Sequence, residues 1–295
     1  MDRVVFLEGT GVRLAVCSAA GVAREASARH GLKAGSAAAL AQGLVGSLLV
    51  AATEKARVDV QLECGGPLRG LLADADESGA VRGLVRVNDL DVALAARPSR
   101  FDARPILATP HDEKAGLISI LRAREGEQSA HRAAFPFAGA DLGAALTFFL
   151  RNDRALGGEL ALEVLVSAEE PLAAAAGALL WGASEDDEQR VRPLGKPLRQ
   201  GALHRALVRS ADAHRLAREL ARELGMGDVT ATAELEPRFA CRCSRERVIR
   251  ALRTLGAAEL RDMAEKDRGA SISCDFCAAR YQVTAQDLLR LAAGS

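Results

Sequence analysis

Apolar and polar positions alternate along several short stretches in the first part of the chain. Val58, Val60 and Leu62 are each followed by a polar residue, and the stretch 159–166 alternates in a similar way. A period of two is that of a half-buried β-strand. The pattern predicts strands over 3–7, 12–17, 57–63, 68–75, 80–87, 117–124, 131–135 and 159–166. A continuous apolar run, 172–180, fits either a strand or a helix.

Helices are predicted over three stretches that lack this alternation. One covers 22–30 and ends before Gly31, another covers 141–149, and the longest covers 36–53, which carries no charge. The serines, glycines and Gln42 within this longest run favour a buried helix over a membrane span. Strands and helices follow one another without a regular βα rhythm. We therefore predict an α+β fold with an antiparallel sheet and packed helices.

The composition changes near residue 184. An acidic run at 184–188 precedes prolines and glycines as far as Gly201, which is typical of a linker. A helix is predicted beyond it, with one apolar stripe and an end at Gly225. The stripe consists of Ala213, Leu216, Leu220 and Leu224. Such a helix either docks firmly on the first domain or, because its stripe is narrow and rich in alanine, is held weakly and can detach.

Four of the six cysteines lie in two close pairs near the C-terminal end. One residue separates Cys241 from Cys243, and two residues separate Cys274 from Cys277. Two such pairs can bring four thiolates onto one tetrahedral ion. Four sulfur donors select zinc or an iron–sulfur centre, and zinc is the commoner occupant of an all-thiolate structural site. One Zn²⁺ per chain is predicted, with buried unliganded cysteines and resting disulfides as the alternatives.

The spacing of the first pair is unusual for a structural zinc site. A disulfide between Cys241 and Cys243 would have to span a single residue, and a strained, exposed disulfide is a labile one. The cysteine group is therefore interpreted as a switch as well as a structural staple. Cys17 and Cys64 have no partner at ligand spacing and are predicted to pack in the core.

The cysteine pairs frame a small domain with its own helices. Ser244 can cap a helix that ends at Gly256, and Thr284 with Asp287 resembles the capping box of a last helix. The apolar stripe predicted for the first of these helices is Val248, Leu252 and Leu255. The rings predicted to form a small core around the metal are those of Phe239, Phe276 and Tyr281. The domains predicted are thus 1–184, a helical metastable linker over 185–236, and a zinc-binding domain over 237–295.

Charge and motif content exclude several functional classes. Lysine plus arginine and aspartate plus glutamate both number 39, so the net charge is zero and gives no general attraction to nucleic acid or an anionic membrane. Met1-Asp2-Arg3 is followed by only a short apolar run, so no signal peptide is evident and a cytoplasmic location is expected. The histidines are scattered and no catalytic motif occurs, so an enzyme is not predicted. Arginines near the cysteines balance a dianionic zinc–thiolate centre or form a nucleic-acid patch.

Several motifs together resemble a known family. The most specific are the run Phe239–Val248 around the first cysteine pair, Leu255-Gly256, and Cys274-Asp275-Phe276-Cys277 with Tyr281. Val12-Arg13, Gly66-Pro67-Leu68 and Val81-Arg82-Gly83 support them. Over nearly its whole length the chain resembles the bacterial redox-regulated heat-shock proteins of thirty-three kilodaltons, which are holdase chaperones.

The resemblance implies a particular activity and particular residue roles. Reduced protein would hold zinc on Cys241, Cys243, Cys274 and Cys277 and be inactive. Oxidation would pair Cys241 with Cys243 and Cys274 with Cys277, release zinc and unfold the zinc domain and linker. The protein, usually as a homodimer, would then bind unfolding client proteins through its N-terminal domain. The alternative function is that of a zinc-ribbon nucleic-acid-binding or regulatory protein.

Overall fold

The chain folds into two compact units, Met1–Ala240 and Cys241–Ser295. The computed structural model describes residues 1–9, 11–108, 116–127, 129–137, 139, 141–152, 157–184 and 187–294. Positions 185 and 186, where the predicted linker begins, lie outside the described residues. Each unit has its own hydrophobic core. The predicted α+β class is confirmed, since helices pack on sheets that are antiparallel except at one short edge strand.

Two six-stranded sheets build the first unit. Sheet A has the order β11-β1-β2-β10-β9-β6, and sheet B has the order β12-β5-β4-β3-β7-β8. The strands of sheet A are β1 (Arg3–Gly9), β2 (Val12–Ser18), β6 (Ser99–Arg100), β9 (Gly158–Val166), β10 (Ala174–Gly182) and β11 (Thr230–Leu235). Those of sheet B are β3 (Arg57–Glu63), β4 (Gly70–Ala75), β5 (Ala80–Val85), β7 (Gly116–Ala123), β8 (His131–Phe137) and β12 (Arg238–Phe239). Every strand predicted from the alternating pattern is present, and the ambiguous run 172–180 is strand β10.

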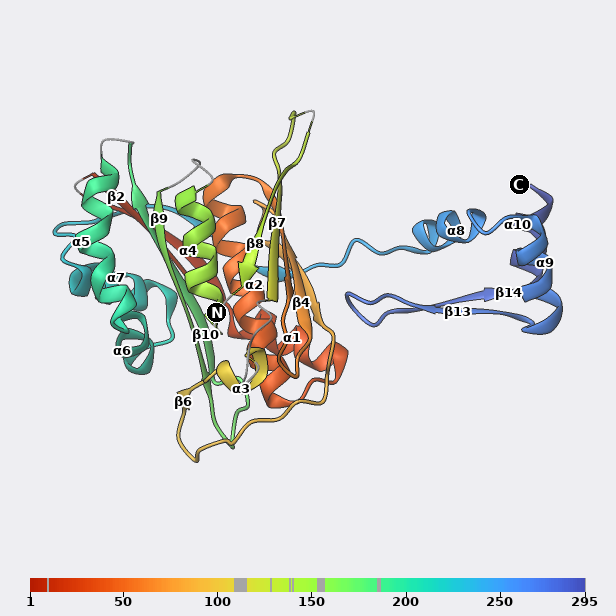
Figure 1. The fold of residues 1–295 in the computed structure, drawn as a ribbon, viewed down its shortest axis with the longest axis horizontal. Helices are drawn as coiled ribbons and strands as arrows, with labels where there is room; N and C mark the ends of the chain where they lie inside the picture. Colours follow the sequence, from red (N-terminus) through yellow and green to blue (C-terminus); the bar gives the residue numbers. More distant parts are fainter. Residues whose placement is uncertain are drawn as a thin grey trace. The chain divides into compact units, whose positions relative to one another are not determined.

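The long helix α2 (Ala34–Glu54) lies between the two sheets (Figure 1). An added Cβ at Gly46 would come within 2.6 Å of Leu146, and one at Gly177 of β10 would come within 2.6 Å of Val45. These glycines let the helix backbone approach its neighbours closely. Among the described residues α2 alone is long and apolar enough to cross a membrane, yet 94% of its most apolar window is buried. It is therefore the core helix that the sequence predicted.

Three further helices complete the middle of the first unit. They are α1 (Ala20–His30), α3 (Arg104–Leu107) and α4 (Leu142–Asn152). α1 packs on α2 and α4 packs on β9. Their apolar side chains join those of α2 and of the facing sides of both sheets in one continuous core. Sheet A consequently has one face turned to this core and a second face that other elements must cover.

The second face of sheet A is covered by the helices of the predicted linker. These are α5 (Glu188–Arg199), α6 (Ala202–Arg209) and α7 (Ala213–Leu224). The predicted stripe on α7 is buried, with exposed fractions of 0–3%, against β1, β2 and their neighbours. Asp212 caps α7 by accepting a hydrogen bond from the Arg215 backbone N–H, and Gly225 ends it in the left-handed conformation. The linker therefore forms a helical layer on the sheet.

Two buried carboxylates of β9 lie under this layer. Glu159 accepts hydrogen bonds from Arg151 of α4 and Arg199 of α5. Glu163 has an oxygen 3.1 Å from His204 Nδ1 of α6 and another 3.1 Å from Arg100 Nη2. Burial, the largest cause, raises the pKa of Glu163 above its usual value. Each carboxylate is thus shared between one partner from the linker and one from the rest of the unit.

The second unit contains three helices and a hairpin. They are α8 (Arg245–Arg253), α9 (Ala257–Lys266), β13 (Gly269–Ser273), β14 (Arg280–Thr284) and α10 (Ala285–Ala293). Ser244 caps α8, and the predicted capping box of Thr284 and Asp287 is present at the start of α10. The core consists of Leu252, Leu260, Ala264, Val283, Leu288, Leu291 and Ala292. This small core agrees with the limited size of the unit.

Some local predictions are wrong. α5 lies within the predicted helical linker but was not predicted as a separate helix, since Pro193 and Pro197 lie inside it; its residues Val191 and Leu198 are buried with the apolar face of sheet A. α8 ends at Arg253, and Gly256 is instead the residue immediately before α9, at its N-cap position. Leu255 is consequently 50% exposed and does not extend the buried stripe. The strands β6, β11, β12 and β13 were not predicted.

The packing of α7 yields a stability prediction. Leu216 is fully buried, so Leu216→Ala should lower the stability of the docked helix by about 2–5 kcal/mol, the usual cost of such a cavity. Hydrogen exchange of residues 187–235 should accelerate in this variant. Arg218→Ala is the matched control on the exposed side of the same helix and should leave exchange unchanged. Equal exchange in both variants would contradict the inferred docking.

Candidate metal centre

Two loops carry the four paired cysteines of the second unit. Cys241 and Cys243 lie between β12 and α8, and Ser244 fixes the end of this segment by capping α8. Cys274 and Cys277 lie in the turn between β13 and β14. That turn is closed by hydrogen bonds from the Cys274 N–H to the Ala279 carbonyl (2.9 Å) and from the Ala278 N–H to the Cys274 carbonyl (2.8 Å). These local hydrogen bonds therefore fix the orientation of the Cys274 and Cys277 side chains.

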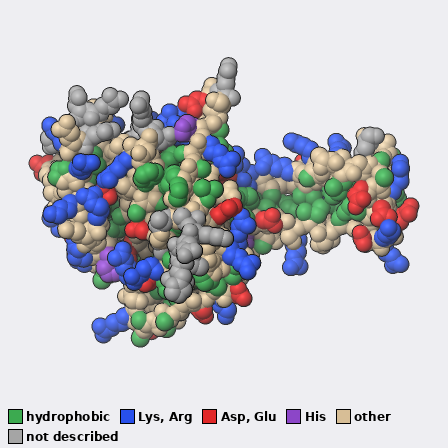
Figure 2. Space-filling model, in the orientation of Figure 1, with side chains coloured by type: hydrophobic (Ala, Val, Ile, Leu, Met, Phe, Trp, Pro, Cys, Tyr) green, Lys and Arg blue, Asp and Glu red, His purple; other side chains and the backbone are tan. Residues whose placement is uncertain are grey.

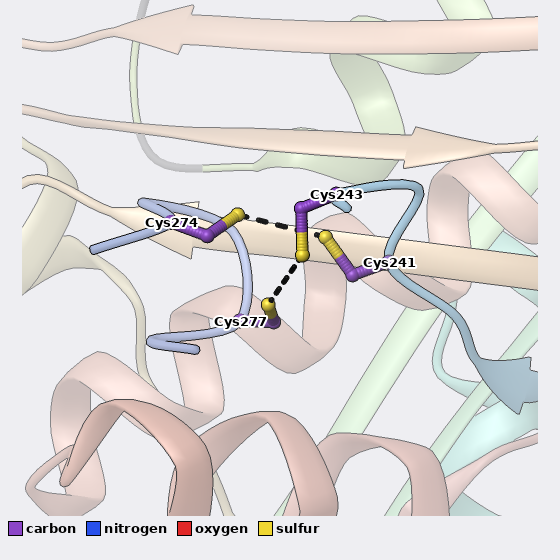
Figure 3. A group of neighbouring side chains, drawn as sticks. All are labelled: Cys241, Cys243, Cys274 and Cys277. Atoms are coloured by element: carbon purple, nitrogen blue, oxygen red, sulfur yellow. Dashed lines mark hydrogen bonds between the residues drawn. The ribbon is translucent and has the colours of Figure 1, made fainter. Parts of the chain in front are cut away.

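The four thiol sulfurs converge on one point (Figure 3). All four sulfurs lie within 4.8 Å of one another. Cys241 Sγ is 3.6 Å from Cys274 Sγ, and Cys243 Sγ is 3.3 Å from Cys277 Sγ. A Zn–S bond of about 2.3 Å in a regular tetrahedron implies sulfurs about 3.8 Å apart. The donor set and its spacing therefore fit a single tetrahedral metal ion.

The protonation of these thiols bears on metal binding. Burial raises the pKa of Cys274 and raises that of Cys277 to about 12. In the metal-free form both groups therefore hold their protons at neutral pH. A metal ion must displace these protons, so its affinity should depend on pH.

Tyr281 contributes a contact that sequence analysis missed. Its hydroxyl donates a hydrogen bond to Cys243 Sγ at 2.9 Å, and this bond is the largest cause that raises the pKa of Tyr281 to about 12. A donor to a ligand sulfur orients the ligand and stabilises its anionic form. The sequence predicted only an apolar ring here. The pairing of β13 with β14, which brings Tyr281 beside the turn, was not visible in the local pattern.

The other predicted residues are placed as follows. Cys17 is fully buried in β2, where burial raises its pKa, and Cys64 packs against the same core, as predicted. The prediction for Phe239 is wrong, because its ring packs on the core of the first unit and lies 4.8 Å from the Arg29 guanidinium. Strand β12 pairs with β5, and this pairing places Phe239 there.

Two of the nearby arginines have structural partners. Arg245 donates to the Gln282 carbonyl at 2.6 Å and to Asp287 at 3.0 Å. Arg238 donates to the Ser78 carbonyl at 2.8 Å. Their bonds explain these residues without a nucleic-acid ligand.

The fold and the cysteine group together define a class: a chain with a two-sheet α+β unit and a small unit that presents four thiols to one centre. The sequence model described as Hsp33 protein matches residues 3–284, so the chain belongs to the Hsp33 family. This finding confirms the family resemblance.

Related proteins agree with this assignment. The chain is 31% identical over 287 residues to proteins named 33 kDa chaperonin from Rippkaea orientalis and from Synechocystis sp., with 95% of this chain and 92% of each relative covered. The crystal structure of the 33 kDa chaperonin (heat shock protein 33 homolog) from Thermotoga maritima matches with a TM-score of 0.76 and 21% identity. The match covers 99% of this chain and 98% of that one, and it shows that the fold is shared.

Removal of one ligand should test the shared centre. Cys274→Ser should abolish tight zinc binding, because three thiolates cannot complete the all-sulfur tetrahedron. Cys64→Ser, which alters a cysteine outside the group, should keep about one zinc per chain by the same ligand count. Metal analysis after gel filtration under reducing conditions measures both. Full zinc content in Cys274→Ser would contradict the assignment.

Removal of the Tyr281 hydroxyl should have a smaller effect. Tyr281→Phe keeps the ring and deletes only the hydrogen bond to Cys243, so stoichiometry should persist while zinc affinity falls about 10-fold or more, as for other outer-shell partners. A competition titration with a chromophoric chelator measures the affinity. Unchanged affinity would show that the hydroxyl does not support the ligand.

Proposed function

We propose that this chain is a redox-controlled holdase chaperone that binds unfolding proteins and prevents their aggregation. Membership of the Hsp33 family and the relatives named 33 kDa chaperonin support the chaperone activity. The observation that carries the control mechanism is the approach of four sulfurs within 4.8 Å of one another. Thiolates so arranged bind zinc when reduced and lose it when oxidised. Zinc binding and thiol oxidation serve to control the activity, and no catalytic role is proposed for these residues.

The reduced protein holds one Zn²⁺ on Cys241, Cys243, Cys274 and Cys277. Each disulfide forms when two thiolates lose two electrons to peroxide, which takes up protons and leaves as water. The proposed pairs are Cys241 with Cys243 and Cys274 with Cys277, as in the family. The two sulfur–sulfur contacts drawn in Figure 3 run across the pairs, from Cys241 to Cys274 and from Cys243 to Cys277. Closing the proposed pairs therefore rearranges the centre, in keeping with unfolding of the small unit.

Loss of zinc is proposed to reach the linker through the chain itself. Ala240 donates its backbone N–H to the Val81 carbonyl at 2.9 Å, immediately before Cys241. β12 and β11 precede this contact, and α7 precedes them. Unfolding of 237–295 would first detach this short segment from the sheet edge. It would then destabilise the packing of 185–236. The apolar face of sheet A, within residues 1–184, would become available to clients.

The remaining features of the proposal concern partners and place. The oxidised protein acts as a homodimer, in the cytoplasm, without nucleic acid or membrane. A zinc-ribbon nucleic-acid function is less well supported, since the net charge is zero. Figure 2 also shows lysines and arginines spread over the visible faces of both units instead of gathered in one patch.

Oxidation of the zinc-loaded protein tests the proposal. Peroxide should release about one zinc per chain, consistent with one tetrahedral site, oxidise four thiols and produce strong suppression of aggregation of a thermally unfolding enzyme. Zinc release, thiol mapping by mass spectrometry and light scattering measure the three effects. A chelator under reducing conditions is the control that separates metal loss from disulfide formation. Zinc release without any gain in suppression would overturn the chaperone assignment.

A further inference from the structure

The edge of sheet A is closed by a strand that contributes almost no side-chain packing. β11 pairs antiparallel with β1 over its length, and it is the outermost strand. Five of its six residues are exposed, and only Leu235 is partly buried. Its side chains are mostly those of threonine and alanine. β11 is therefore held chiefly by main-chain hydrogen bonds, which do not depend on sequence.

The contacts that supplement this pairing are weak. Arg3 lies 3.9 Å from both Glu234 and Glu236, and these carboxylates are well exposed. Exposed ion pairs of this kind contribute little stability. The register also shifts between Phe6 and Leu7, which leaves Thr232 as an extra residue in β11. Such a bulge interrupts the ladder.

β1 itself is a strong template for a partner strand. It is seven residues long, contains no proline, and carries Val4, Val5, Phe6 and Leu7 in succession. Natural proteins usually protect such an edge with proline, inward charges or short strands. Among the described residues, β11 is the element that pairs with this edge.

β1 does not depend on β11 for its own place in the sheet. It pairs along its whole length with β2 on the other side. Val4 and Phe6 belong to the core between the sheets, whereas Val5 and Leu7 face the linker helices. Removal of the segment 185–240 would therefore leave β1 in the sheet, with its free edge beside a newly exposed apolar face.

We propose that the edge of β1, once β11 leaves it, binds an extended segment of an unfolding polypeptide as an added β-strand. Main-chain hydrogen bonds would supply recognition without regard to sequence, and the neighbouring apolar face would bind apolar side chains. β11 thus occupies the site in the closed protein as a built-in substitute for the client. The inference rests on the proposed function, because oxidation must first release the linker.

Hydrogen exchange of residues 3–9 in the full-length protein tests the proposal. The probe is a short peptide of alternating threonine and valine with a terminal lysine for solubility. It is prepared in three forms: unmodified, with every second backbone N–H methylated so that one edge of the strand is blocked, or with all backbone N–H groups methylated so that both edges are blocked. The backbone amides of residues 3–9 that point to β11 should be protected in the reduced zinc-loaded protein, exchange freely after oxidation, and regain protection when the peptide is added. The amides that point to β2 should stay protected throughout and serve as the internal control.

The methylated peptides separate strand addition from side-chain binding. The one-edge peptide retains a free edge and should protect β1, whereas the both-edge peptide should bind about tenfold more weakly or worse because its backbone donors are lost. Equal protection by all three peptides would overturn the proposal. Continued protection of the β11-facing amides after oxidation would also overturn it. Such protection would mean that β11 remains in place or, if it rises with protein concentration, that a second copy occupies the edge.

The outcome is distinguishable from failure of the proposed function. Protection of β1 by the peptide without suppression of aggregation would leave the edge site standing and remove the chaperone assignment. Suppression of aggregation without edge-dependent protection would support the chaperone assignment and overturn the edge site. Competition completes the test: the unmodified peptide should reduce client capture by the oxidised protein, and the both-edge peptide should not.

Discussion

The convergence of four sulfurs is the constraint on which the small unit depends. Its apolar core is built from only a few buried side chains, and a unit of this size gains little from burial alone. Bringing both cysteine loops to one centre fixes the turn between β13 and β14 and the start of α8 together. From there the chain continues backwards into β12 and β11, which close the edges of the two large sheets. The chain thus links the cysteine centre directly to the edge strands of the main fold.

Much of this arrangement could be predicted because its causes are local. The capping residues Ser244 and Thr284, the stripe on α7 and the alternation in β3 each depend on neighbours a few positions away. The cysteine group was also predictable, since ligand type and spacing within each pair are local properties. The helix formed by 188–199 was not, because its two prolines disfavour a helix locally and burial against sheet A outweighs them.

Other features could not be predicted because they arise from distant pairing. β11 has small, exposed side chains and takes its conformation from β1, more than two hundred residues earlier in the chain. Its position just before the first cysteine pair predicts that Phe239 joins that centre, but pairing of β12 with β5 places its ring on the core of the first unit. Tyr281 was recognised as aromatic, while its hydroxyl contact depended on the hairpin register.

The shared carboxylates Glu159 and Glu163 each have a second partner outside the helical layer. Arg151 and Arg100 belong to the underlying unit and would stay beside these carboxylates if α5 and α6 lifted away. Neither carboxylate would then be stranded without a counter-charge, and both would regain water. Removing the only partner of a buried carboxylate strongly lowers the stability of a protein, whereas a carboxylate that keeps one cation avoids most of this cost. If the helices lifted, the unit beneath would therefore keep its charge pairs and its fold, and its surface would still match the same helices on their return.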